Sequence, residues 1–387
     1  MVNILAADMT EIHGEMYACG IVALFPYLMD PYSKNGYEHF YDRESGSGYL
    51  AWRLKIIQRK SVISEGRRSP CQLTSGGPKA RREALFSPEV ALSEEQCREA
   101  MSFMKHSTDE AAIKQKMKLT FEFRCKMVLD GEKSSEVLTE FPRFKDIRGL
   151  IEQDFILLFG EEIAAKFLER WPTTFKQKVI QQSKALPTSS DLEELIHCAE
   201  APSYEEEMDD DTLASGWDSD LSSILLLLHL IPPSAQGRKR PGKVSSASQA
   251  EKRLVVFKKV LKRLEHFAFC LCNNLKCEMG AISTILIYGF HHSIKSATQP
   301  YLLAVGMKRS TVHEFFIVLD KQVIPCKSTT SLAAFDELFK AHFVFGTMYS
   351  QMLHNMYTFI QTTVYNIDVG KVQESPRVAE MRARMLH

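Results

Sequence analysis

Apolar residues recur at helical spacing through residues 93–200, and this periodicity predicts a run of helices. Ser93 followed by Gln96 forms a capping-box pattern, in which the two side chains satisfy free backbone amides at a helix start. Thr108 can cap the helix that follows, and Pro172 is expected to begin a new segment, because proline disrupts a helix interior. We therefore expect a helical domain over this region.

Residues 300–368 show a different pattern, with two runs typical of β-strands before two segments with helical spacing. Asp320 and Lys321 are expected to form a hairpin turn inside the second run. Four apolar residues of the first helical segment share one face: Leu332, Phe335, Leu338 and Phe339. Strands followed by helices predict a small α+β domain with helices packed on one side of a sheet. The expected fold class is therefore α+β and predominantly helical, with helical N-terminal modules and a C-terminal β-hairpin or meander with packed helices.

An almost unbroken apolar run occupies residues 221–231 and stops at Pro232. Its eleven residues are too few to span a membrane, since a spanning helix needs about 20. Asp218 and Asp220 lie at the start of the expected helix, where the positive end of the helix dipole stabilises negative charge. Ser219 or Asp220 can cap this helix. Because the run is apolar on every side, we expect a core helix, with a docking helix for a partner as the alternative.

Residues 17–29 are also apolar, but no positively charged segment precedes them, as it would in a signal peptide. We expect this stretch to be a buried helix end. The nine cysteines are odd in number and mostly scattered, which is typical of reduced thiols in the cytoplasm or nucleus.

Charge is balanced overall, at 48 Lys and Arg against 48 Asp and Glu, but it is segregated along the chain. Residues 191–220 contain twelve acidic residues and no Lys or Arg. Within them the run EEEMDDD is expected to be disordered, as part of an acidic linker at 201–220. Ten basic residues stand against three acidic ones between residues 43 and 83, and ten against one between residues 238 and 263. Mutual screening of the acidic and basic runs is one explanation of this pattern, and binding to a partner is the other.

Several long motifs occur in a fixed order, among them GYEHFYDRESGSGYLAWRLKIIQR, LIEQDFILLFG, AAKFLERWPTTFK, GWDSDLSSILLLLHLIPP and TFIQTTVYNIDVGKVQESPRV. Through them the chain resembles the fish-type family similar to sterile alpha motif domain-containing protein 3, over residues 20–258 and 297–384. The resemblance implies no catalytic residues. The family's sterile alpha motif is a five-helix interaction domain that is expected upstream of GYEHFYD, and it is not apparent in this sequence. Residues 260–296 also differ from the family, which indicates either an insertion or a gene-model error.

The expected organisation has five parts. They are a basic helical module at 17–60, a flexible basic linker at 61–92, a helical domain at 93–200, an acidic linker at 201–220, and a C-terminal α+β domain at 221–384 that includes the atypical insert at 260–296.

Candidate chemistry is sparse. Five residues offer zinc-type ligands: Cys270, Cys272, Cys277, His291 and His292. Their Cys-x-Cys and His-His spacings differ from the paired turns that hold zinc, so we expect no metal site. No phosphate-binding glycine loop is present in the sequence, and His229, His342 and His354 lie in apolar helical stretches without a nucleophile to activate. We therefore expect no catalytic residues and no cofactor.

The two leading hypotheses concern binding, and an unrecognised enzyme is the third. We expect a non-enzymatic intracellular protein–protein interaction or adaptor protein with protein partners and no membrane partner. The alternative is a nucleic-acid-associated protein of mobile-element ancestry that binds phosphates through residues 43–83. The segment GRKRPGK suits a nuclear import signal or an electrostatic latch for the acidic tract. The basic residues that would bind nucleic acid or a partner are Arg53, Lys55, Arg59, Lys60, Arg67, Arg68, Arg238, Lys239 and Arg240.

Overall fold

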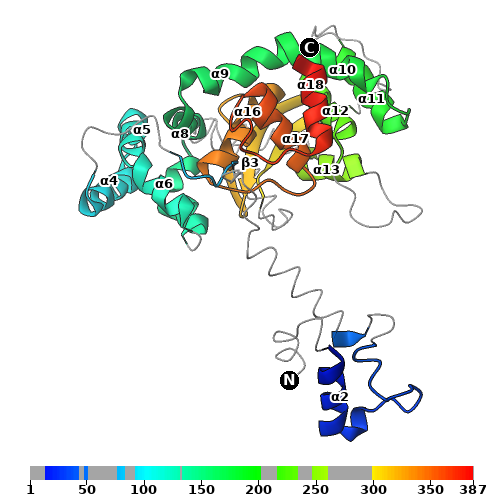
Figure 1. Ribbon diagram of the computed structural model, residues 1–387. Coiled ribbons are helices and arrows are strands. Elements are labelled where there is room, and N and C mark those ends of the chain that lie inside the picture. Colours follow the sequence, from blue (N-terminus) through cyan, green and yellow to red (C-terminus); the bar gives the residue numbers. More distant parts are fainter. Residues whose placement is uncertain are drawn as a thin grey trace. The chain divides into compact units, whose positions relative to one another are not determined.

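The computed structural model describes residues 14–42, 48–50, 76–82, 92–130, 133–201, 216–233, 246–259 and 299–386. The chain divides into two compact units, a small unit of residues 1–72 and a large unit of residues 73–387. Figure 1 labels their elements.

The small unit contains the helix α2 (Gly14–Leu24) and a 3-10 turn, η2 (Pro26–Leu28). Its core joins Ala18 and Ile21 of α2 to Leu50, with partly buried aromatic residues packed around them. Residues 17–29 are therefore buried only in part, since Leu24 and Tyr27 are exposed. A helix buries one face, so an apolar run of this length leaves its other side chains in solvent.

A four-stranded mixed sheet lies at the centre of the large unit, in the order β1 (Val255–Lys259), β2 (Tyr301–Lys308), β3 (Thr311–Leu319) and β4 (Gln322–Pro325). β1 pairs with β2 in parallel, and β2, β3 and β4 form an antiparallel meander. The expected hairpin turn is present, with Asp320 and Lys321 both in the left-handed region at φ 48° and 63°.

The helices of the large unit are α4 (Glu94–His106), α5 (Glu110–Leu119), α6 (Phe121–Leu129), α7 (Val137–Glu140), α8 (Leu150–Phe159), α9 (Glu161–Arg170), α10 (Lys176–Ser183), α11 (Ser190–Glu200), α12 (Ser219–Leu230), α13 (Ser246–Leu254), α16 (Ser331–Val344), α17 (His354–Phe359) and α18 (Pro376–Leu386). Short 3-10 or π turns are η3 (Ser134–Glu136), η4 (Pro142–Lys145), η5 (Trp171–Phe175) and η7 (Ile360–Val364). This content confirms a predominantly helical α+β fold. Figure 1 shows α4, α5 and α6 as a lobe beside α8.

One hydrophobic core joins this unit. It includes residues from Met101 to Met385, so helices of the expected domains at 93–200 and 221–384 pack on each other. The apolar run expected to be a core helix is α12, and its leucines are buried on every side, which confirms that interpretation. Its N-cap is Asp218, whose carboxylate accepts hydrogen bonds from the backbone amides of Asp220 and Leu221. The prediction that Ser219 or Asp220 caps this helix is therefore wrong.

Two other local predictions need correction. Asp109, one residue after the expected Thr108, caps α5 by accepting the amides of Ala111 and Ala112. The new segment expected at Pro172 begins one residue earlier, at Trp171, and Pro172 is the second residue of this π turn, η5, which links α9 to α10. Trp171 in that turn donates its indole N–H to Ser223 of α12 over 3.0 Å, which holds the turn against the core.

Candidate functional site

The nine basic residues proposed from the sequence lie outside the described residues: Arg53, Lys55, Arg59, Lys60, Arg67, Arg68, Arg238, Lys239 and Arg240. The five zinc-type candidates at 270, 272, 277, 291 and 292 also lie outside them. Within the described part of the chain, no group of three or more His, Cys, Asp or Glu side chains is arranged to hold a metal ion.

The three histidines that the sequence places in apolar helical stretches, at positions 229, 342 and 354, differ in environment. His342 is buried, its Nδ1 lies 3.1 Å from the carbonyl oxygen of Thr347, and burial lowers its pKa to about 4. A neutral imidazole with this partner has a structural role. His229 is half-buried, and burial lowers its pKa as well. The His354 residue is exposed as a whole, but partial burial of its ring lowers the pKa in the same direction.

A groove lies between α4 and α6. The capping box at Ser93 and Gln96 starts α4, as the sequence predicted, with Ser93 Oγ accepting the Gln96 amide at 3.2 Å. The groove has a volume of about 580 Å³. Residues spaced three or four apart line it from α4, which places them on one helix face.

The groove has an apolar floor. Six apolar side chains form it: Leu92, Cys97, Met101, Leu119, Phe123 and Met127. Burial raises the pKa of the Cys97 thiol, which keeps it protonated at neutral pH and therefore a weak nucleophile. The floor is thus suited to apolar contact rather than to covalent chemistry.

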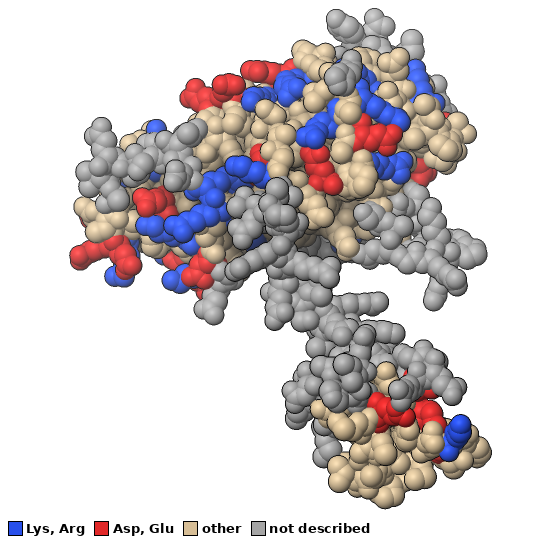
Figure 2. Space-filling view, in the orientation of Figure 1, with Lys and Arg blue, Asp and Glu red and all other residues tan. Residues whose placement is uncertain are grey.

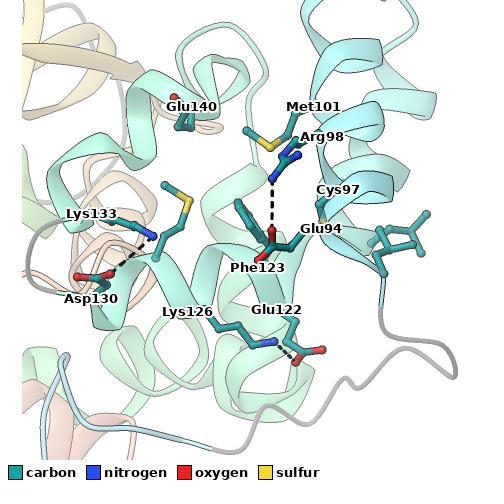
Figure 3. Close-up of a pocket in the computed structure, with 13 residues that line it drawn as sticks. Glu94, Cys97, Arg98, Met101, Glu122, Phe123, Lys126, Asp130, Lys133 and Glu140 are labelled. Carbon is teal, nitrogen blue, oxygen red and sulfur yellow. Dashed lines mark hydrogen bonds and ion pairs between the residues drawn. The ribbon is translucent and has the colours of Figure 1, made fainter.

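Charged side chains of both signs surround the floor, and Figure 3 shows them paired within their own segments. Glu94 pairs with Arg98 at 3.3 Å, and Glu122 with Lys126 at 2.9 Å. Figure 2 shows acidic and basic side chains interspersed over the lobe of α4, α5 and α6. Apart from Glu140, the rim charges are paired with one another. The rim does not present the single-sign surface expected of a phosphate-binding site.

The opposite face of α6 is fixed to the rest of the large unit. Arg124 and Asp154 of α8 are both buried, and two guanidinium nitrogens contact the carboxylate at 3.0 and 2.7 Å. Arg124 also donates to Thr120 over 2.8 Å, and its guanidinium lies 5.1 Å from the ring centre of Phe141. These contacts attach α6, one wall of the groove, to α8 on the side opposite the apolar floor.

The described structure defines a predominantly helical α+β protein with a grooved helical lobe. Residues 91–146, which contain the groove, match the family model of the helical domain of sterile alpha motif domain-containing protein 3. The match confirms, for this region, the family resemblance found in the sequence. No curated protein and no solved structure matches the chain.

Sequence reasoning identified the helices of this lobe and missed the groove. Its floor combines residues from α4 and α6, and the angle between two helices is not readable from either helix alone. The available signal was the series of opposite charges four residues apart, Glu94 with Arg98 and Glu122 with Lys126, which marks the exposed faces.

Proposed function

We propose that this chain is a non-enzymatic protein–protein interaction protein whose helical lobe binds a partner through the groove between α4 and α6. The observation that supports it most is the open apolar floor inside a charged rim, within the residues that match the family's helical domain. An amphipathic helix of the partner fits this arrangement, because such helices insert apolar side chains into grooves of this kind. We propose that binding takes place in the cytoplasm or nucleus.

The alternative of nucleic-acid binding rests on the basic residues between 43 and 83. One of them, Arg82, is paired with Asp368 and is only slightly exposed, so it is not available to a phosphate. Lys79 and Arg81 are exposed. If nucleic acid is the partner, charge reversal at Arg53, Lys55 and Arg59 abolishes binding, and affinity falls steeply with salt.

No helix among the described residues combines the length and apolar character needed to cross a membrane.

Affinity purification of the intact chain from cells tests the proposal, with nuclease-treated and untreated halves compared by mass spectrometry. The informative variant is Phe123→Glu, which places a charge on the apolar floor. Phe103→Glu is the matched control, because Phe103 is an exposed phenylalanine on α4 that does not line the groove. We expect nuclease-resistant partners that Phe123→Glu loses and Phe103→Glu retains. Partners that disappear with nuclease, or that bind both variants equally, contradict the proposal.

A further inference from the structure

The side chain of Arg82 occupies an aromatic pocket of the large unit. Its guanidinium carbon lies 5.1 Å from the ring centre of Phe159 and 5.2 Å from that of Phe343. The guanidinium also forms an ion pair with Asp368, and both side chains are mostly buried, at 14% and 12% exposed. Residues distant in the sequence therefore surround a single arginine with two aromatic rings and one carboxylate.

The carboxylate of Asp368 is held in place by groups other than Arg82. Gln361 donates from Nε2 to Asp368 Oδ2 over 2.8 Å, and Tyr349 donates its hydroxyl to Gln361 Oε1 over 3.0 Å. Asp368 has φ 55°, in the left-handed region, within a turn where Asn366 and Gly370 also have positive φ. Such backbone conformations cost free energy and persist only where the surroundings enforce them. The carboxylate that binds the arginine is therefore held in position by the turn itself and by Gln361.

Two glycines, Gly76 and Gly77, lie close to the turn at Asp368 and belong to the same segment as Arg82, residues 76–82. The amide of Gly77 donates to the same oxygen of Asp368 over 2.8 Å, and Gly77 has φ 105°. A Cβ atom on Gly76 would lie 2.7 Å from Val372 Cγ2 and 3.0 Å from the Cβ of Asp368. The pocket thus fits a Gly-Gly pair followed, five residues after the second glycine, by an arginine.

We propose that Phe159, Phe343 and Asp368 form an arginine-binding pocket for Gly-Gly segments of a partner protein, and that residues 76–82 fill it as an intramolecular ligand. A planar guanidinium can contact the aromatic rings and the carboxylate together, which a lysine ammonium does less well. A partner segment of this chemistry competes with residues 76–82, so its binding requires their release. This site is separate from the groove and does not depend on the function proposed for it.

Fluorescence anisotropy with a labelled peptide of residues 75–83 tests the pocket in trans. The full chain carrying Gly76→Val and Arg82→Ala has an emptied pocket, because both changes remove contacts of the internal segment. We expect this variant to bind the peptide at least about tenfold more tightly than the wild-type chain does, and a peptide with Lys at the Arg82 position to bind at least about tenfold more weakly. Adding Asp368→Asn to the variant abolishes binding.

The matched control is the chain carrying Lys79→Ala and Arg81→Ala, two exposed positions of the same segment. Its pocket stays filled, so it binds the peptide no better than the wild-type chain. A folded emptied variant, verified by thermal melting, that shows no arginine-dependent binding overturns the proposal.

A second measurement needs no added peptide. Trypsin cleaves after Lys79, and docking of residues 76–82 protects that bond. We expect the single change Asp368→Asn to speed this cleavage about tenfold or more, because it weakens the ion pair and the contacts of the Gly77 amide. Equal cleavage rates in the two chains overturn the internal-ligand assignment.

Discussion

The groove between α4 and α6 and the centre of α16 both contain acidic and basic side chains, in opposite environments. At the groove rim, Glu94 and Arg98 are 82% and 75% exposed and pair in solvent. In α16, Lys340 is 1% exposed and contacts Asp336 and Glu152 of α8, each at 2.5 Å. Tyr365 donates its hydroxyl to Asp336 as well.

The difference lies in what removal of a charge leaves behind. A solvated pair contributes little, because water replaces the lost partner. A buried pair is costly to break, since the remaining charge stays in a medium that solvates it poorly. The α16 cluster is therefore part of the architecture of the fold, whereas the exposed charges of the groove rim can be changed at little cost to the fold.

The largest effect is expected at Lys340. Lys340→Met leaves the buried carboxylate of Asp336 and the partly exposed carboxylate of Glu152 without their cation. We expect a loss of about 3–5 kcal/mol in the free energy of unfolding, most of it from Asp336. Urea denaturation measures it. A change smaller than about 1 kcal/mol would show that water reaches the cluster.

The next effect is a pH dependence. Burial raises the pKa of Glu337 to about 7, and that of Asp336 to about 6 although Lys340 opposes the rise. Because the folded chain binds these protons more tightly than the unfolded chain, stability from this source is full below about pH 4.5 and is lost as pH rises through about 7.

Glu337→Gln keeps an oxygen that can accept the Lys327 amide, which Glu337 binds at 2.8 Å. Between pH 4.5 and 7 the free energy of unfolding of the wild-type chain should fall by roughly 3 kcal/mol more than that of Glu337→Gln, because the variant lacks the titrating carboxyl. Denaturant melts at several pH values measure this difference, and parallel curves for the variant and wild-type chains would contradict it.

Ser93→Ala removes the N-cap of α4 beside the groove and should cost about 1 kcal/mol. Ser102→Ala is a suitable comparison on the same helix, because Ser102 is an exposed serine inside α4 and away from its ends. Thermal melting of both variants checks the prediction. An equal loss in the two would mean that the cap contributes nothing specific.

The smallest effect is expected at the rim. Arg98→Gln breaks an exposed pair and should change the free energy of unfolding by no more than about 0.5 kcal/mol. The same denaturation assay tests it, and a loss comparable to that of Lys340→Met would abolish the distinction between the two regions.

The sequence predicted much of the fold where the pattern is local. α12 was recognised because its leucines are apolar on every side, and the turn at Asp320 and Lys321 because it separates two β-rich runs. β1 was missed, since its five residues VVFKK follow directly on a helix and end in lysines.

Burial of α16 was only partly predictable. Its apolar face was identified, but Asp336, Glu337 and Lys340 on its polar side are also buried. Helix α8 supplies Glu152 to this side, and a contact between residues almost two hundred positions apart leaves no signal in the local pattern. The Arg82 pocket was missed for the same reason, because its parts come from α8, α16 and the turn at Asp368.

The most direct test of the central claim is site-specific photo-crosslinking from the groove in cells, followed by nuclease treatment. A photoreactive residue at Lys126 faces the groove rim, and one at Glu99, exposed on α4 and absent from the groove lining, is the control. If the groove binds a partner protein, position 126 gives a discrete protein adduct that is absent from position 99 and is lost when Phe123→Glu is added. The same adducts from both positions, or adducts that Phe123→Glu leaves unchanged, would contradict partner binding at the groove.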